Sequence, residues 1–282
     1  MDPAPAPAAQ RTTVGALPNV VVIGAQKCGT SALHWYLRHH PGASVSQPKE
    51  LDFFLQERNW SKGVDWYRAH FDAGRPVRVD ASPNYTAHPF HRGVMGRMAA
   101  VVPDARLIYL VRDPLARIAA HWAHNYALGR HDGDVAALLA ARSTYVTRSM
   151  YALQLDQVLA HFPADRLLVL DQRELREHRA ATLRRVFAYA GLDPDVRDPA
   201  FDAERNRTEL KKVPTTLGRA GRRVLPERAW LAVKDRRFMR RSVPLPDVRR
   251  ALPPATLDLL RADATRFTAV TGVDTARWSL WT

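Results

Sequence analysis

The chain has 282 residues, of which 46% are apolar and 25% are charged, and it carries a formal net charge of +14 at pH 7. This length and composition are typical of one globular domain with a large buried core. No stretch approaches the roughly 18 apolar residues of a membrane span, and the single cysteine, Cys28, excludes an intramolecular disulfide and a zinc site built from several thiolates. We therefore expect no membrane span, no metal ion and a reducing, cytoplasmic location.

The first 18 residues, MDPAPAPAAQRTTVGALP, are rich in proline and alanine. They lack an apolar run of signal-peptide length, and the acidic Asp2 argues against the start of a secretory signal. Residues 1–18 are therefore predicted to form a flexible tail, and residues 19–282 a single domain.

This domain is predicted to alternate strands and helices. A β-branched run at 19–25, NVVVIGA, indicates a buried strand, and the helical stretch at 30–40 stops before Pro41. Further strands are predicted at 77–80, 105–111 and 166–170, and further helices at 114–128, 149–162, 178–190 and 254–270. The alternation predicts an α/β fold with one parallel β-sheet flanked by helices on both faces.

A glycine-rich loop, GAQKCGTS at residues 24–31, lies between the first strand and the first helix. Its G-x-x-x-x-G spacing is that of a nucleotide phosphate loop, whose backbone N–H groups point at an anion held at the helix N-terminus. A Walker loop needs lysine directly after the second glycine, but Thr30 stands there and Lys27 lies inside the loop. This displacement favours a phosphosulfate over a triphosphate, because the lysine then lies beside the bond between a 5′-phosphate and the group it carries.

Five segments resemble the sulfotransferase superfamily, in the branch of the heparan sulfate sulfotransferases and their bacterial relatives. In chain order they are QKCGTSALHWYLRHHP at 26–41, KELDFF at 49–54, GVDWY at 63–67, SPNY at 82–85 and RDPLAR at 112–117. The resemblance runs from about residue 19 to 192 and implies a P-loop-like sulfotransferase fold. It also implies that 3′-phosphoadenosine 5′-phosphosulfate (PAPS) is the donor. The residues that this implies at the 5′-phosphosulfate are Gln26, Lys27, Cys28, Gly29, Thr30 and Ser31.

The RDPLAR segment resembles the family's 3′-phosphate motif, which implies that Arg112 binds that phosphate. The planar fork of an arginine suits a phosphate dianion, and the helix that opens at Pro114 adds its positive end. Asp113 is expected to order the turn, and Arg117 to be a structural ion-pair partner.

The motif departs from the family pattern at two positions. Ala120 stands where the family has a serine that hydrogen-bonds the 3′-phosphate, and Trp122 replaces a tyrosine. Loss of one hydrogen bond to a charged group costs about 1.5–3 kcal/mol unless another group replaces it. His121 and the basic segment described next are the candidates for that replacement.

Residues 205–250 form a basic segment with fifteen Lys and Arg, four Asp and Glu, and a net charge of +11. Four prolines interrupt it, so loops and short helices that cover donor and substrate are expected. The family closes a late loop over its donor, and TLGR at 216–219 is the proposed counterpart, with Gly218 and Arg219 as donor contacts. Other basic residues compete for this role: Arg205, Arg207, Lys211 and Lys212. No DNA- or RNA-binding signature accompanies the charge, so we expect no nucleic-acid partner.

Transfer of a sulfuryl group to a hydroxyl needs a base within hydrogen-bond reach of the acceptor. Glu50 is predicted to be that base, because its place in KELDFF matches the catalytic glutamate of the family. The alternative for Glu50 is an ion pair with Lys49 or Lys27. Asp80 is the second candidate for the base, although its expected role is to brace the donor loop. Lys27 is predicted to stabilise the leaving phosphate oxygen.

Three questions stay open at this level. Two rival functions are a kinase that uses ATP and magnesium and a non-catalytic protein that binds polyanions through residues 205–250. The acceptor is a hydroxylated small molecule or a saccharide, and residues 60–75 and 123–150 are expected to shape its pocket. Cys28, beside Lys27, is either a reactive thiol of lowered pKa or a small side chain that fits its slot, and we favour the second interpretation.

Overall fold

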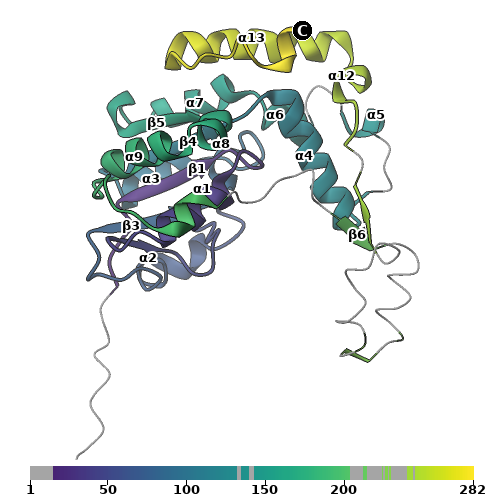
Figure 1. Ribbon diagram of the computed structural model, residues 1–282. Helices are drawn as coiled ribbons and strands as arrows, with labels where there is room; N and C mark the ends of the chain where they lie inside the picture. The colour runs from purple at the N-terminus through teal and green to yellow at the C-terminus, as the bar shows by residue number, and fades with distance from the viewer. Residues whose placement is uncertain are drawn as a thin grey trace, which may run out of the picture.

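The structure is a computed structural model that describes residues 15–131, 135–139, 143–203, 212–214, 224, 226, 227, 229, 240–243 and 245–282 (Figure 1). Five parallel strands form its central sheet in the order β2-β3-β1-β4-β5. Their bounds are β1 Val20–Gly24, β2 Ala43–Val45, β3 Val77–Ala81, β4 Arg106–Val111 and β5 Leu167–Asp171. The predicted parallel α/β fold is therefore confirmed.

The two central strands are buried on both faces, as their sequences require. All five residues of β1 are buried, and in β4 only Arg106 is exposed. Continuous runs of Val, Ile and Leu with no polar alternation are typical of strands covered by helices on both sides. Such runs are also why β1 and β4 could be located from the sequence.

Helices flank this sheet on either side (Figure 1). Their bounds are α1 Thr30–Arg38, α2 Gly63–Arg68, α3 Val94–Val101, α4 Pro114–Ala127, α5 Val135–Leu138, α6 Thr144–Thr147, α7 Tyr151–Leu159, α8 Gln172–Glu177, α9 Arg179–Ala190, α12 Val248–Ala251 and α13 Pro254–Thr271. Some helix ends are capped by neighbouring residues that can be recognised in the sequence. The Asp113 side chain caps α4, since it accepts from the N–H groups of Leu115 and Ala116. Gly191 ends α9 in the left-handed conformation that favours glycine.

All the strands and long helices expected from the sequence are present, with bounds that differ by one to three residues. The elements that were not predicted are β2, α2, α3 and α8, together with the four-residue helices α5, α6 and α12. They are short, and among them only α3, VMGRMAAV, carries apolar residues at helical spacing. Within the basic segment the structure describes two short antiparallel strands, β6 Lys212–Pro214 and β7 Arg240–Ser242.

The predicted tail lies mostly outside the described residues, which begin at Gly15. Leu17 packs against the core, and its carbonyl accepts a hydrogen bond from Arg78 Nε at 2.7 Å. No helix in the described part of the chain is long and apolar enough to cross a membrane. The flexible tail and the cytoplasmic location stay predictions.

Candidate functional site

Two loops meet at the carboxyl edge of the sheet, where β1 and β4 run side by side. The Ala25 N–H, just after β1, donates to the Leu110 carbonyl of β4 at 2.7 Å. In open parallel sheets ligands bind beyond the carboxyl ends of strands whose connections diverge, and β1 has β3 on one side and β4 on the other. The fold therefore brings the loop at 24–31 beside the loop that begins at Arg112.

The first loop has the backbone of an anion cradle. Gly29 begins α1 with φ 97°, and Lys27 has φ 72°, a left-handed conformation that is uncommon outside glycine. A Cβ at Gly29 would also lie 3.3 Å from Gln172 Cγ. The glycine at this position is therefore required by conformation and by space, and it turns the chain into the N-terminus of α1.

A tyrosine of α7 joins the two loops. The Tyr151 hydroxyl donates to the Arg112 carbonyl at 2.7 Å, accepts from the Arg112 N–H at 3.3 Å, and lies 3.5 Å from Cys28 Sγ. Asp113 caps α4 and also accepts from the Ser279 N–H of the C-terminal segment. Asp113 orders the turn, as the sequence analysis expected.

Cys28 is fully buried, and burial raises the pKa of its thiol to about 11. A thiol with this pKa is almost entirely protonated at neutral pH and is a poor nucleophile. The structure thus supports the interpretation of Cys28 as a small side chain that fits its slot.

Arg117 is fully buried and binds no carboxylate in the part of the chain that the structure describes. It donates from Nε to Ser149 Oγ at 2.5 Å and from Nη2 to the Tyr145 carbonyl at 2.6 Å, and a longer bond of 3.4 Å runs from Nη1 to the Gln26 carbonyl. Burial lowers the pKa of this guanidinium. The expected ion pair is therefore replaced by neutral acceptors, one of them in the phosphate loop, and the positive charge is not compensated there.

The replacement of the family serine at Ala120 leaves an apolar, buried position on α4. Beside it, burial and then the charge of Arg117 hold the pKa of His121 well below its usual range. His121 is therefore neutral, and any compensation it gives for the missing serine is a hydrogen bond and not a charge. Trp122, at the family tyrosine, stacks on Tyr126 with ring centroids 5.1 Å apart.

The segment KELDFF packs against two of the other segments that resemble the sulfotransferase family, GVDWY and SPNY. Phe53 and Phe54 are fully buried, and Phe53 stacks on Tyr67 of α2 with ring centroids 4.2 Å apart. The hydroxyls of Tyr67 and Tyr85 both donate to Asp80 Oδ2, at 2.8 and 2.7 Å. Three of the sequence segments, at 49–54, 63–67 and 82–85, thus form one packed cluster.

Asp80, the second candidate for the base, is fully buried at the centre of this cluster. Besides the two tyrosines it accepts from Ser82 Oγ at 2.7 Å, and Ser82 in turn accepts from the Asp52 N–H at 3.0 Å. Burial raises the pKa of Asp80. With both oxygens occupied and no exposure to solvent, Asp80 is suited to bracing the loop and not to taking a proton from an acceptor.

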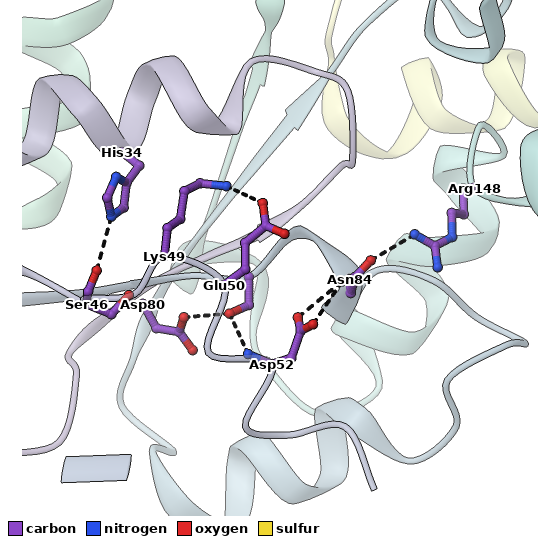
Figure 2. Close-up of polar contacts among 9 residues, drawn as sticks. His34, Ser46, Lys49, Glu50, Asp52, Asp80, Asn84 and Arg148 are labelled. Atoms are coloured by element: carbon purple, nitrogen blue, oxygen red, sulfur yellow. Dashed lines mark hydrogen bonds and ion pairs between the residues drawn. The ribbon is translucent and has the colours of Figure 1, made fainter. Parts of the chain in front are cut away.

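Glu50 lies at the open side of the same loop. Its carboxylate pairs with Lys49 Nζ at 2.5 Å, and 42% of its side chain is exposed (Figure 2). Two residues later Asp52 is buried, and burial raises its pKa to about 6. The pair with Lys49 is one of the alternatives that the sequence left open, and a surface ion pair of this kind is easily exchanged for another partner.

Sequence reasoning missed Arg148, which lies between α6 and α7. Its Nη1 donates to Gln26 Oε1 at 3.1 Å and to Asn84 Oδ1 at 2.9 Å. Asn84 Nδ2 donates to both carboxylate oxygens of Asp52, and Figure 2 shows the chain from Arg148 through Asn84 to Asp52. Arg148 falls in the range 123–150 that was expected to shape the acceptor pocket, but nothing in its local sequence marks it. Gly218 and Arg219 lie outside the described residues.

The arrangement combines buried positive charge with a reachable carboxylate. Arg117 and Arg148 have no acidic partner within 4 Å among the described residues, and Lys27, Arg117 and Arg148 all contribute to the low pKa of His121. Uncompensated buried cations are costly unless an anion binds beside them. The positive charge therefore favours an anionic ligand here, and Glu50 lies at the edge of the same site.

Known proteins are similar to this chain in sequence and in fold. Residues 17–221 match the family described as "Sulfotransferase domain". The chain is 30% identical over 209 residues to bifunctional heparan sulfate N-deacetylase/N-sulfotransferase 2 of Homo sapiens, and 29% identical over 205 residues to that of Bos taurus. These matches cover 64% of the chain but only 23% of each relative.

Solved structures agree on the fold. A sulfotransferase from Alicyclobacillus acidocaldarius superposes with a TM-score of 0.68 at 22% identity, covering 93% of this chain and 99% of that one. Sulfotransferase STF9 from Mycobacterium avium gives a TM-score of 0.52 at 12% identity, covering 94% of this chain and 79% of that one. Since the family match spans well over half of its residues, the chain belongs to the sulfotransferase domain family.

Proposed function

We propose that the protein transfers a sulfuryl group from PAPS to a hydroxyl of a small molecule or saccharide. The observation that carries the proposal is the link through Tyr151 between the loop at 24–31 and the loop at Arg112. PAPS has two phosphate groups on one ribose unit, so its binding needs two anion sites close together. Two such loops on neighbouring strands meet this requirement.

The 5′-phosphosulfate would bind to the loop of Gln26, Lys27, Cys28, Gly29, Thr30 and Ser31, at the N-terminus of α1. The 3′-phosphate would bind to Arg112 near the position of Ala120, and Gly218 and Arg219 would close over the donor. Buried Arg117 would assist binding of the phosphosulfate indirectly. It donates a hydrogen bond to the Gln26 carbonyl, and its positive charge lies next to the loop.

The chemistry of this reaction is an in-line displacement that the protein assists by positioning and by charge. Glu50 removes the proton of the acceptor hydroxyl as its oxygen attacks sulfur. The bond from sulfur to the bridging oxygen breaks, and the ammonium group of Lys27 stabilises the negative charge that this oxygen gains. Glu50 then holds the proton, and adenosine 3′,5′-bisphosphate leaves.

An amino group is a second candidate for the acceptor. The curated relatives carry N-sulfotransferase in their names, and sulfuryl transfer to nitrogen needs the same donor site and base. Turnover with matched amino and hydroxyl forms of one sugar, glucosamine and glucose in oligosaccharides, would separate the two acceptors.

The donor can be tested by titration calorimetry with adenosine 3′,5′-bisphosphate. We expect tight, stoichiometric binding that Lys27→Ala and Arg112→Ala each weaken by tenfold or more, on the order of 1.4 kcal/mol. Arg266→Gln, far along α13 in an exposed pair with Asp156, is the matched control. Absence of binding to the unaltered protein would refute the proposal.

The two rival functions predict different results for nucleotide binding, for turnover in the presence of chelator and for heparin binding. A kinase would bind ATP with magnesium more tightly than the bisphosphate and would lose turnover in chelator. A polyanion-binding protein would retain heparin after Lys27→Ala and would show no turnover. Sulfuryl transfer in the presence of chelator would exclude both.

A further inference from the structure

Arg148 occupies the place where the loop of the proposed donor site and the loop of Glu50 come together. One nitrogen, Nη1, donates both to Gln26, next to Lys27, and to Asn84. Figure 2 shows the bond to Asn84, whose amide in turn donates to Asp52. The guanidinium is therefore held by two side chains that lie 122 and 64 residues away in the sequence.

The same guanidinium has a second donor group that lacks an acceptor. Arg148 Nε is buried and has no hydrogen-bond partner among the residues described. An N–H group shut away from water without an acceptor costs about 1–3 kcal/mol, and more when the group is charged. Arg68 and Arg179 also have a buried Nε without an acceptor, but only Arg148 also contacts the proposed donor loop.

The positive charge of Arg148 also lacks a partner, because no acidic side chain pairs with it among the described residues. Burial, followed by the repulsion of Arg117, lowers the pKa of Arg148 to about 10, and Asp52 opposes this effect. The side chain is still cationic at neutral pH, but the Asp52 carboxylate is reached only through Asn84. A second anion next to Gln26 would complete the charge balance.

We propose that Arg148 binds the sulfuryl oxygens of the donor. The inference rests on the proposed function and adds a donor-contacting residue to it. A sulfuryl group attached to a phosphate beside Lys27 and facing Glu50 lies between the two loops that Arg148 connects. Arg148 gives hydrogen bonds and charge to the non-bridging oxygens and exchanges no proton, and the bonds made and broken stay those of the displacement.

This contact distinguishes the loaded donor from the spent one. Adenosine 3′,5′-bisphosphate has the same two phosphates but no sulfuryl group, so Arg148 would bind only PAPS. The protein would then favour the donor over the product with which it competes, and release of the product would be easier than its phosphate contacts alone allow.

The test compares two affinities in one variant. For Arg148→Met, which keeps the length and removes the charge, we expect binding of PAPS without acceptor to weaken about tenfold or more. Binding of adenosine 3′,5′-bisphosphate should change by no more than about twofold. Arg148→Lys should recover part of the loss for PAPS, because the charge returns without the planar fork, and Arg266→Gln should change neither affinity.

Equal weakening of both nucleotides would overturn the proposal and make Arg148 a positioning residue of the phosphate loop. Unchanged donor affinities with a raised KM for the acceptor would also overturn it, and would assign Arg148 to the acceptor. Thermal unfolding of both variants checks that they fold, and Arg148→Lys keeps the test decisive if Arg148→Met does not. If the unaltered protein bound neither nucleotide, the proposed function itself would be refuted. That result differs from the two outcomes above, in which the unaltered protein binds both nucleotides.

Discussion

Single residues in this protein differ sharply in how far they are removed from water, and the difference separates their roles. Asp80 and Arg117 are fully buried. Asp80 accepts three hydrogen bonds of 2.8 Å or less. Arg117 donates to the neutral acceptors Ser149 and Tyr145 at 2.5 and 2.6 Å. Glu50, in contrast, has 42% of its side chain exposed and a single ion pair with Lys49. A base must exchange its partner for an acceptor in each cycle, so the exposed carboxylate is the one suited to catalysis.

Replacement of Glu50 by glutamine tests this assignment at the residue scale. Glu50→Gln keeps the shape of the side chain and removes its basicity, so we expect kcat to fall by about 10²-fold or more. The affinity for adenosine 3′,5′-bisphosphate should stay within about twofold, since no donor contact is altered. Initial rates and calorimetry measure the two quantities.

Asp104→Asn, at an exposed acid just before β4, is the matched control and should leave kcat unchanged. If Glu50→Gln retained most of its activity, the base would lie elsewhere. Asp52 would then be the next carboxylate to replace, because it lies two residues away in the same loop.

Whole elements are joined in this fold by side chains that cap another element. α13 lies beside α7 (Figure 1). α7 begins at Tyr151 with no cap of its own, and Asp263 of α13 accepts from the N–H groups of Ala152 at 3.0 Å and Leu153 at 2.9 Å. These are two of the N–H groups that a helix start leaves without partners. Because Tyr151 contacts both the loop at 24–31 and the loop at Arg112, the C-terminal helix supports the candidate site.

Removal of this cap should destabilise the protein without touching the site directly. Asp263→Ala leaves two buried N–H groups unpaired, so we expect the free energy of unfolding to fall by about 1–3 kcal/mol. Asp263→Asn keeps one acceptor and should lose less. Urea denaturation at pH 7 measures the change, with Asp258→Asn at an exposed pair of the same helix as the control; equal stability of all variants would contradict the capping role.

At the scale of the whole molecule, buried carboxylates make stability depend on pH. Burial raises the pKa of Asp52 and of Asp263 from 3.8 to about 6. A carboxyl group whose pKa is raised on folding favours the folded state below its unfolded pKa, and this contribution is lost as the pH rises through the folded pKa. The two groups therefore stabilise the protein less at pH 7 than at pH 4.

The variant Asp52→Asn isolates one of these contributions, because an amide does not titrate. Relative to the unaltered protein, the variant should gain on the order of 1–3 kcal/mol of unfolding free energy between pH 4 and pH 7. Urea denaturation at several pH values measures the difference. A difference that is constant over this range would show that Asp52 has an ordinary pKa in the folded protein.

The sequence predicted the framework because local patterns encode it. The apolar runs of β1 and β4 and the glycines at 24 and 29 act over a few residues, and they correctly predicted a strand, a turn and a helix start. Segments such as KELDFF and SPNY were recognised separately, and the structure shows that they are parts of one aromatic cluster around Asp80. The short elements β2, α2, α3 and α8 were missed because they form by packing against this framework.

By itself the sequence therefore determined the order of the main strands and helices, the positions of the two candidate loops, and Glu50 and Lys27 as candidates. The tertiary structure alone decided that Arg117 lacks an acidic partner in the described chain, that Arg148 links Gln26 to Asn84, and that α13 caps α7. These are contacts between residues about 60 to 120 positions apart. No local pattern specifies such a contact, because it exists only when the folded sheet brings the two segments together.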